Sequence, residues 1–237
     1  MTASIISSSA SGSSGAIDYP SGDGQPVAET FAHLYAIMMT IELLRLYLEG
    51  ERVTVLGNQY LYYSQGYPKL RTAPDVMVIF GVEPGGRDNY KIWEEGEVPR
   101  VAFEMTSPST RHQDDGFKKD LYEQLGIEEY WQFDPKGEWI PAGLRGYRLT
   151  DGLYQPIKNG VSVALGLRLE RTESLITFYR LDSGDKLLLP RELKASLEQE
   201  SQARNLAEQR ADSAEQRAKD LATKLSEYEA RFGLLEE

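Results

Sequence analysis

Two acidic side chains stand inside short apolar segments, where a carboxylate is unfavourable. Asp75 opens the run from Val76 to Phe80, and Glu104 lies within the run from Val101 to Met105. An ionised carboxylate inside a sheet is costly unless it is paired or binds a cation. If the two segments are neighbouring strands, Asp75 and Glu104 can bind one hard divalent ion, Mg²⁺ or its substitute Mn²⁺.

A lysine follows these carboxylates in the next predicted helix. Lys118 lies about one turn into the segment from near Gln113 to Leu125, which Gly126 ends. An ammonium beside a divalent ion and a phosphate can orient or deprotonate an attacking water and stabilise the developing negative charge. The three residues therefore predict a metal-dependent hydrolase that acts on a phosphodiester, with Asp75 and Glu104 as metal ligands.

Each of these carboxylates also has a structural interpretation. Asp75 could cap the turn that follows Pro74. Glu104 could form a structural ion pair with Lys118 or Arg111. The combined spacing favours the metal site over these alternatives.

Other polar and aromatic residues near the predicted site are expected to be structural. His33 and His112 are predicted to be structural or solvated histidines rather than metal ligands. Asp114 and Asp115 are expected to cap the helix that carries Lys118. The large aromatic side chains in this region are expected to pack in the core; they are Tyr122, Tyr130 and Trp131.

The hydrophobic pattern predicts the elements that position these residues. A helix is expected from about Ala28 to Glu49, on an apolar stripe that includes Leu34 and Met38 or Ile37. Segments 52–56 and 59–63 flank Gly57-Asn58 and predict a hairpin. Further strands are expected at 76–80, 101–105, 129–133, 146–149, 153–157, 165–169 and 175–179. We therefore predict an α/β fold with a mixed central sheet flanked by helices.

The composition changes abruptly at Arg191, which predicts a long C-terminal helix. Seam positions are spaced alternately by four and three residues, the heptad pattern of a coiled coil. They are Leu193, Leu197, Glu200, Arg204, Ala207, Ala211, Ala214, Ala218, Leu221, Leu225, Tyr228 and Phe232. The helix therefore either associates with a second copy, giving a homo-oligomer, or stays single and solvated. The predicted organisation is a flexible leader at 1–17, a folded body at 18–189 and a helical tail at 190–237.

Several motifs together resemble the signature of the Uma-type restriction endonucleases, a bacterial family of the PD-(D/E)XK nuclease superfamily. They are Pro74-Asp75, the run Phe103 to Thr110, Asp114, Lys118, Tyr122 and the run Leu125 to Pro135. The resemblance covers roughly residues 18–180 and is densest at 74–135. It implies a restriction-endonuclease-like α/β core with a Mg²⁺-dependent site that cleaves phosphodiesters.

The resemblance also implies a role for individual residues. Asp75 corresponds to the Asp of the PD element and Glu104 to the second acidic residue. The position two residues after Glu104 is Thr106 rather than Lys. The resemblance instead assigns the lysine role to Lys118, four residues before Tyr122, with its neighbour Lys119 as a second candidate. Glu29, at the start of the first helix, corresponds to an additional acidic residue of many such nucleases.

Composition limits the cellular setting and the partners. The chain contains no cysteine, which fits a reducing cytoplasm. Its longest apolar run, 34–48, is interrupted by Glu42 and Arg45, so no membrane span is expected. The net charge is −11, and residues 1–189 carry 18 Lys and Arg against 26 Asp and Glu, a balance of −8. This balance argues against tight non-specific binding to nucleic acid.

Two function hypotheses follow from these observations. The first is a metal-dependent endonuclease that acts on DNA, with RNA as an alternative substrate of the same chemistry. The second is a non-catalytic, nuclease-like adaptor that docks partners through its C-terminal coiled coil. The acidic balance of residues 1–189 is the best support for the adaptor.

Overall fold

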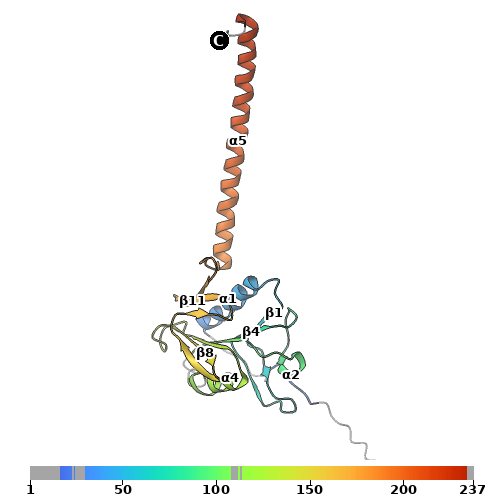
Figure 1. Ribbon diagram of the computed structural model, residues 1–237, viewed down its shortest axis with the longest axis vertical. Coiled ribbons are helices and arrows are strands. Elements are labelled where there is room, and N and C mark those ends of the chain that lie inside the picture. The colour runs from blue at the N-terminus through green and yellow to red at the C-terminus, as the bar shows by residue number, and fades with distance from the viewer. Residues whose placement is uncertain (1–16, 23, 25–29, 108–111, 113, 234–237) are drawn as a thin grey trace, which may run out of the picture. The chain divides into compact units, whose positions relative to one another are not determined.

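The structure, a computed structural model, describes residues 17–22, 24, 30–107, 112 and 114–233 (Figure 1). It divides into two units, residues 1–187 and residues 188–237. The helices of the described residues are α1 (Phe31–Tyr47), α2 (Ile92–Glu95), the π-helical turn η1 (Asp114–Lys118), α4 (Lys119–Leu125) and α5 (Pro190–Phe232). None of them is long and apolar enough to cross a membrane.

The first unit is built on a mixed sheet of six strands in the order β1-β4-β6-β7-β8-β9. Its strands are β1 (Val53–Leu56), β4 (Val76–Phe80), β6 (Val101–Met105), β7 (Glu129–Phe133), β8 (Leu144–Thr150) and β9 (Leu153–Ile157). Strands β6 and β7 are parallel, and the other neighbouring pairs are antiparallel. The predicted mixed sheet is therefore confirmed.

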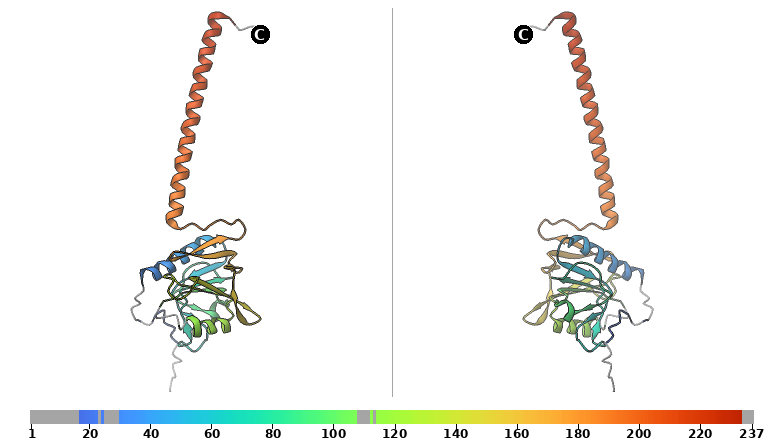
Figure 2. Two further views of the ribbon diagram at one scale, coloured as in Figure 1. Left: turned by 90° about the vertical axis from the view of Figure 1, so that its left-hand side faces the viewer. Right: turned by 90° about the vertical axis from the view of Figure 1, so that its right-hand side faces the viewer.

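Two three-stranded sheets complete this unit. One contains β10 (Val161–Ser162), β11 (Leu167–Thr172) and β12 (Leu175–Arg180), and the other contains β3 (Arg71–Thr72), β2 (Leu61–Tyr62) and β5 (Tyr90–Lys91). Figures 1 and 2 show α1 and the β10–β12 sheet on one side of the central sheet and α4 on the other. The central sheet is therefore covered on both faces, which explains why β4, β6 and β7 are almost wholly buried.

Side chains of β6 alternate between these two covers. Phe103 packs edge-on against Phe178 of β12, with ring centroids 6.4 Å apart. Ala102 points to the opposite face, where it joins a buried cluster with Tyr122 of α4 and Tyr130 of β7. Because side chains alternate along a strand, Glu104 shares the α4 face with Ala102. This alternation directs Glu104 toward the helix that carries Lys118.

Helix α1 begins and ends within the predicted range, but its buried stripe is rotated. Thr30 caps the N-terminus, where its hydroxyl accepts a hydrogen bond from the His33 backbone N–H at 3.4 Å. Leu34 and Met38, which the predicted stripe includes, are about half exposed. The buried positions are His33, Ala36, Ile37, Thr40, Leu43 and Leu44. The prediction used apolar residues alone and therefore placed the buried face of α1 wrongly. Two polar residues, His33 and Thr40, are also buried on the observed face.

The predicted hairpin around Gly57-Asn58 is wrong. Strand β1 pairs with β4, in the register Val53↔Phe80, whereas β2 pairs with β3 and β5 in a separate sheet. A Cβ on Gly57 would lie 2.2 Å from the Ile41 side chain of α1. Gly57 is therefore required by close packing against α1, and the chain leaves the central sheet there instead of folding back on β1.

The helix predicted from Gln113 to Leu125 begins with a π-helical turn. Within the described residues, η1 covers Asp114–Lys118 and α4 continues to Leu125, with Gly126 in the left-handed conformation at its end. π-helical turns are rare in proteins overall, but those that occur are frequently found at functional sites. Here the π turn contains Asp114 and ends at Lys118.

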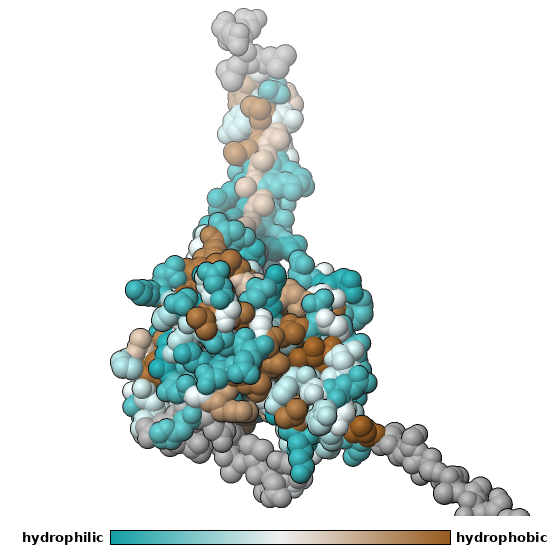
Figure 3. All heavy atoms as spheres, turned by 60° about the horizontal axis from the view of Figure 1, so that its bottom comes forward, coloured by the Kyte–Doolittle hydropathy of each residue, from teal (hydrophilic) through white to brown (hydrophobic). Residues whose placement is uncertain are grey.

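The second unit contains the 43-residue helix α5, Pro190–Phe232. Its surface is rich in charges, with ion pairs one turn apart such as Arg204–Glu208 at 3.1 Å. A row of hydrophobic and intermediate spheres runs along the helix between hydrophilic ones (Figure 3). The predicted long helix is confirmed.

Candidate active site

Asp75 and Glu104 lie on neighbouring antiparallel strands. The register of β4 and β6 pairs Met77 with Ala102 and Val76 with Phe103, so Asp75 follows directly opposite Glu104. The Met105 backbone N–H donates a hydrogen bond to Asp75 Oδ2 at 2.6 Å, which holds the aspartate at this point. Two like charges in opposed positions destabilise a sheet unless something neutralises them.

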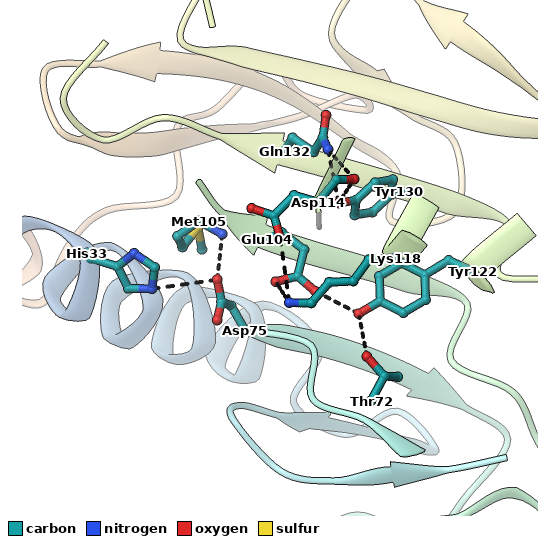
Figure 4. Close-up of polar contacts among 10 residues, drawn as sticks. All are labelled: His33, Thr72, Asp75, Glu104, Met105, Asp114, Lys118, Tyr122, Tyr130 and Gln132. Carbon is teal, nitrogen blue, oxygen red and sulfur yellow. Dashed lines mark hydrogen bonds and ion pairs between the residues drawn. The ribbon is translucent and has the colours of Figure 1, made fainter. Parts of the chain in front are cut away.

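Glu104 is buried, and both of its carboxyl oxygens accept hydrogen bonds from the helix above it (Figure 4). Lys118 Nζ donates to Oε2 at 2.7 Å, and the Tyr122 hydroxyl donates to Oε1 at 2.6 Å. The Tyr122 hydroxyl also lies 3.4 Å from Thr72 Oγ1. The carboxylate is therefore fixed in orientation by two residues spaced one helical turn apart.

A third carboxylate, Asp114, belongs to the same cluster. Its Oδ1 lies 3.6 Å from Lys118 Nζ, and its side chain is almost fully buried. Its backbone carbonyl accepts hydrogen bonds from Gln132 Nε2 at 2.7 Å and from the Tyr130 hydroxyl at 3.0 Å. Because Gln132 pairs with Glu104 in the parallel register of β6 and β7, the sheet holds the π turn directly over Glu104.

Among the described residues, the cluster contains three carboxyl groups and one ammonium. Asp75, Glu104 and Asp114 lie around Lys118. Burial raises the pKa of Glu104 to about 8, and repulsion from Asp75 and Asp114 adds to this rise. Burial alone would lower the pKa of Lys118, but attraction to Glu104, Asp75 and Asp114 keeps that pKa above its usual value. The lysine is therefore a stable cation, which the carboxyl groups of Glu104, Asp75 and Asp114 share among the described residues.

Glu129 shows what a satisfied buried carboxylate looks like in the same sheet. It is as buried as Glu104, but it accepts hydrogen bonds from Arg148 at 2.9 Å, from Ser162 at 2.5 Å and from the backbone of Val163 at 2.9 Å. One arginine thus balances one carboxylate there. Glu104 differs in that two other carboxyl groups, Asp75 and Asp114, lie near its lysine partner.

The donor chemistry of the cluster fits a hard divalent cation. Carboxylate oxygens are its preferred ligands, and its two positive charges would favour the ionised form of Glu104 beside Asp75. In the part of the chain that the structure describes, no three acidic, histidine or cysteine residues are arranged to hold a metal by themselves. Mg²⁺ commonly binds through one or two carboxylates and completes its shell with waters and phosphate oxygens. Asp75 and Glu104 would hold such an ion, and the Asp75 and Lys118 side chains, each 14% exposed, connect the cluster to solvent.

A comparison with known families identifies the family of this chain. The model of the Uma2 family, described as a putative restriction endonuclease, matches residues 11–188. The chain belongs to this family. The predicted resemblance is therefore confirmed, and the Uma2 match together with the mixed α/β architecture bears out the restriction-endonuclease-like fold class.

A solved structure with some similarity is described as a putative nuclease belonging to DUF820 from Anabaena variabilis ATCC 29413. It is 13% identical, with a TM-score of 0.42, and the similarity covers 58% of this chain and 73% of that chain. A comparison with curated proteins gives no match.

The structure brings together the three principal residues that the sequence singled out in this Uma2 chain. Asp75, Glu104 and Lys118 form one cluster, whereas Lys119 lies elsewhere, with its ammonium 4.4 Å from the centre of the Tyr147 ring. Glu29, the additional acidic candidate, lies outside the described residues. His33 is buried with Nε2 3.6 Å from Asp75 Oδ2, next to the cluster.

Sequence reasoning missed the parts that Asp114, Tyr122 and Gln132 play. Asp114 was expected to cap a helix, and Tyr122 to pack in the core. A signal was present, because Asp114, Lys118 and Tyr122 recur every four residues and so share one helix face. Gln132 carried no such signal, since only its register beside Glu104 brings it to the site.

The raised pKa of Glu104 predicts a specific pH dependence of stability in metal-free protein. The folded state keeps its proton up to about pH 8, whereas the ordinary pKa is 4.5. The folded state thus binds more protons than the unfolded state between these values, so stability falls as pH rises through this window, by up to about 1.4 kcal/mol per pH unit. Glu104→Gln removes this contribution.

Urea unfolding with a chelator, at intervals from pH 5 to pH 9, measures this effect as the difference between wild type and Glu104→Gln. The other titratable groups of the cluster, His33, Asp75, Asp114 and Lys118, are present in both proteins, so the difference measures the titration of Glu104 together with its coupling to these groups. Parallel stability curves for the two proteins would contradict the assignment.

Proposed function

We propose that this member of the Uma2 family is a divalent-metal-dependent endonuclease that hydrolyses phosphodiester bonds in DNA, with Mg²⁺ as its metal and Mn²⁺ as a substitute. One observation carries the proposal: Asp75 and Glu104 are opposed in the sheet, and among the described residues they share the Lys118 ammonium with a third carboxyl group, Asp114. Carboxylates grouped in this way favour the binding of a cation.

Each residue of the cluster would have a separate role in the reaction. Asp75 and Glu104 would bind the cation, which when bound supplies Lewis acidity toward the phosphate and the attacking water. Tyr122 and the Met105 backbone N–H hold the two carboxylates in place through their hydrogen bonds. Lys118 has donors beyond the one used by Glu104, and they would orient the attacking water or offset the charge that develops on the phosphate oxygens.

The decisive experiment is a plasmid-nicking assay with purified full-length protein. The proposal expects nicking in Mg²⁺ or Mn²⁺ and none in a chelator. The adaptor hypothesis, which the balance of −8 over residues 1–189 favours, expects no nicking and no divalent-ion dependence. A Mn²⁺ titration separates the two further, because a working site should bind the ion through Glu104.

We further propose that residues 18–189 form the nuclease domain of a cytoplasmic protein and that residues 190–237 join two copies. A homodimer would bring two sites into one assembly. The apolar seam positions Leu221 and Leu225 are more than half exposed, and burial of such side chains drives helix association.

If α5 joins two copies, substitutions at its seam positions should change the oligomeric state. In the full-length protein, Leu221→Glu together with Leu225→Glu is expected to weaken dimerisation at least tenfold, because two apolar seam contacts become charge repulsions. Sedimentation equilibrium measures it. Thr223→Glu, on the opposite side of the heptad, is the matched control and should leave the dimer intact. A monomeric wild-type chain would contradict the proposed pairing.

A further inference from the structure

A hollow of about 450 Å³ opens beside the candidate site. Its lining includes Lys118 of the acidic cluster and Thr72, whose hydroxyl lies near Tyr122. The wall is also formed by Tyr60, Lys69, Arg71 and Phe117. A ligand in this hollow would therefore touch the reactive lysine directly, and the remaining lining indicates what kind of ligand that is.

The hollow is cationic although the chain is acidic. Lys69 is exposed, and the Arg71 guanidinium lies 4.3 Å above the centre of the Tyr60 ring, held there by a hydrogen bond to the Pro68 carbonyl at 3.1 Å. Within the part of the chain that the structure describes, neither Lys69 nor Arg71 forms an ion pair with a carboxylate. Two cations without acidic partners can contact phosphate oxygens.

The hollow also contains an exposed aromatic ring. Phe117 belongs to the π turn, directly before Lys118, and 64% of it is exposed. A phenyl ring in this position can stack on a base, and it can do so only if the base is not already stacked and paired in a duplex. The volume of the hollow is within the range of small-ligand sites and can accommodate a nucleotide.

We infer that this hollow binds single-stranded DNA, with one unstacked base on Phe117 and neighbouring phosphates on Lys69 and Arg71. The inference rests on the proposed function and adds to it that the preferred substrate is an unpaired strand. It also accounts for the acidic balance of the chain, because a site with two phosphate contacts and one stacked base does not need a long basic surface.

Binding of a fluorescently labelled oligodeoxythymidine of about 12 nucleotides, measured by anisotropy in a chelator, tests the inference. The single strand is expected to bind full-length protein at least tenfold more tightly than a duplex that contains it. Phe117→Ala is expected to weaken single-strand binding about tenfold, and Phe117→Trp to restore it. Lys69→Ala should lower the affinity for the single strand. It should also reduce the slope of log affinity against log salt concentration by the amount expected for about one phosphate contact.

Matched controls lie elsewhere on the surface. Phe232→Ala removes a ring that is 70% exposed on α5, and Lys158→Ala removes an exposed lysine; neither should change the affinity. Equal affinity for single strand and duplex, tighter binding of the matched RNA strand, or no effect of Phe117→Ala would overturn the inference.

The same assay separates this inference from the proposed function, since binding in a chelator does not require the reaction. Strand binding through Phe117 without nicking in any divalent ion contradicts the nuclease proposal alone. Nicking without a preference for the unpaired strand contradicts the inference alone.

Discussion

Glu104→Gln and Asp75→Asn are each expected to lower metal-dependent plasmid nicking by about a hundredfold to a thousandfold. Each substitution removes one negative charge from the pair that would bind the cation while keeping the size of the side chain. In Glu104→Gln, the amide oxygen can still accept from Lys118, and the amide nitrogen can donate to the Tyr122 hydroxyl. The fold is therefore expected to survive the loss of activity.

The measurement is the initial rate of plasmid nicking in Mg²⁺ and in Mn²⁺, together with circular dichroism to check the fold and a Mn²⁺ titration. Both variants should lose affinity for Mn²⁺ as well as activity. Glu128→Gln is the matched control, because Glu128 is an exposed acid that pairs with Arg100 at the surface. Activity that survives in both Asp75→Asn and Glu104→Gln contradicts the assignment of the site.

Lys118→Met is expected to lower nicking about a hundredfold without weakening Mn²⁺ binding, because the loss of a neighbouring positive charge favours a cation at the carboxylates. The substitution keeps a long side chain but removes the ammonium that donates to Glu104 at 2.7 Å and would face the developing charge. It also removes the ammonium beside the buried Glu104 and Asp114 and the partly exposed Asp75, so some loss of stability is expected in metal-free protein.

The neighbouring lysine provides the sharpest control for this prediction. Lys119 lies one residue further along the helix, and its ammonium sits over the Tyr147 ring, 4.4 Å from its centre. Lys119→Met should therefore stay within about twofold of wild type, since a cation–π contact at this position is worth little to the reaction. Equal losses in the two variants would show that general charge, rather than the position of Lys118, supports nicking.

Local patterns in the sequence were sufficient to predict several strands and the choice of the candidate lysine. Short apolar runs predict β4, β6 and β7 because strands buried on both faces are apolar along their whole length. The choice of Lys118 over Lys119 follows from helical geometry and the family resemblance, since one residue turns a side chain by about 100 degrees. These features depend on residues close together in the chain.

These local patterns could not predict which distant segments pair in a sheet. The run 59–63 looked like the partner of 52–56, but β1 pairs with β4 because the chain packs Gly57 against Ile41 and leaves the sheet. The buried face of α1 was misplaced for a similar reason, as the environment of His33 comes from the sheet beneath it and from Asp75.

The distinction between Glu104 and Glu129 shows most clearly what only the tertiary structure decided. In the sequence both are acidic residues within apolar strands. In the fold Glu129 is balanced by Arg148 and Ser162, which come from 19 and 33 residues further along the chain, whereas Glu104 faces Asp75, Asp114 and a single lysine. Composition and spacing determined that carboxylates would be buried in this sheet. Which of them shares its cation with other carboxyl groups depends on side chains brought from distant segments, because the electrostatic cost of a buried charge is set by its neighbours in space.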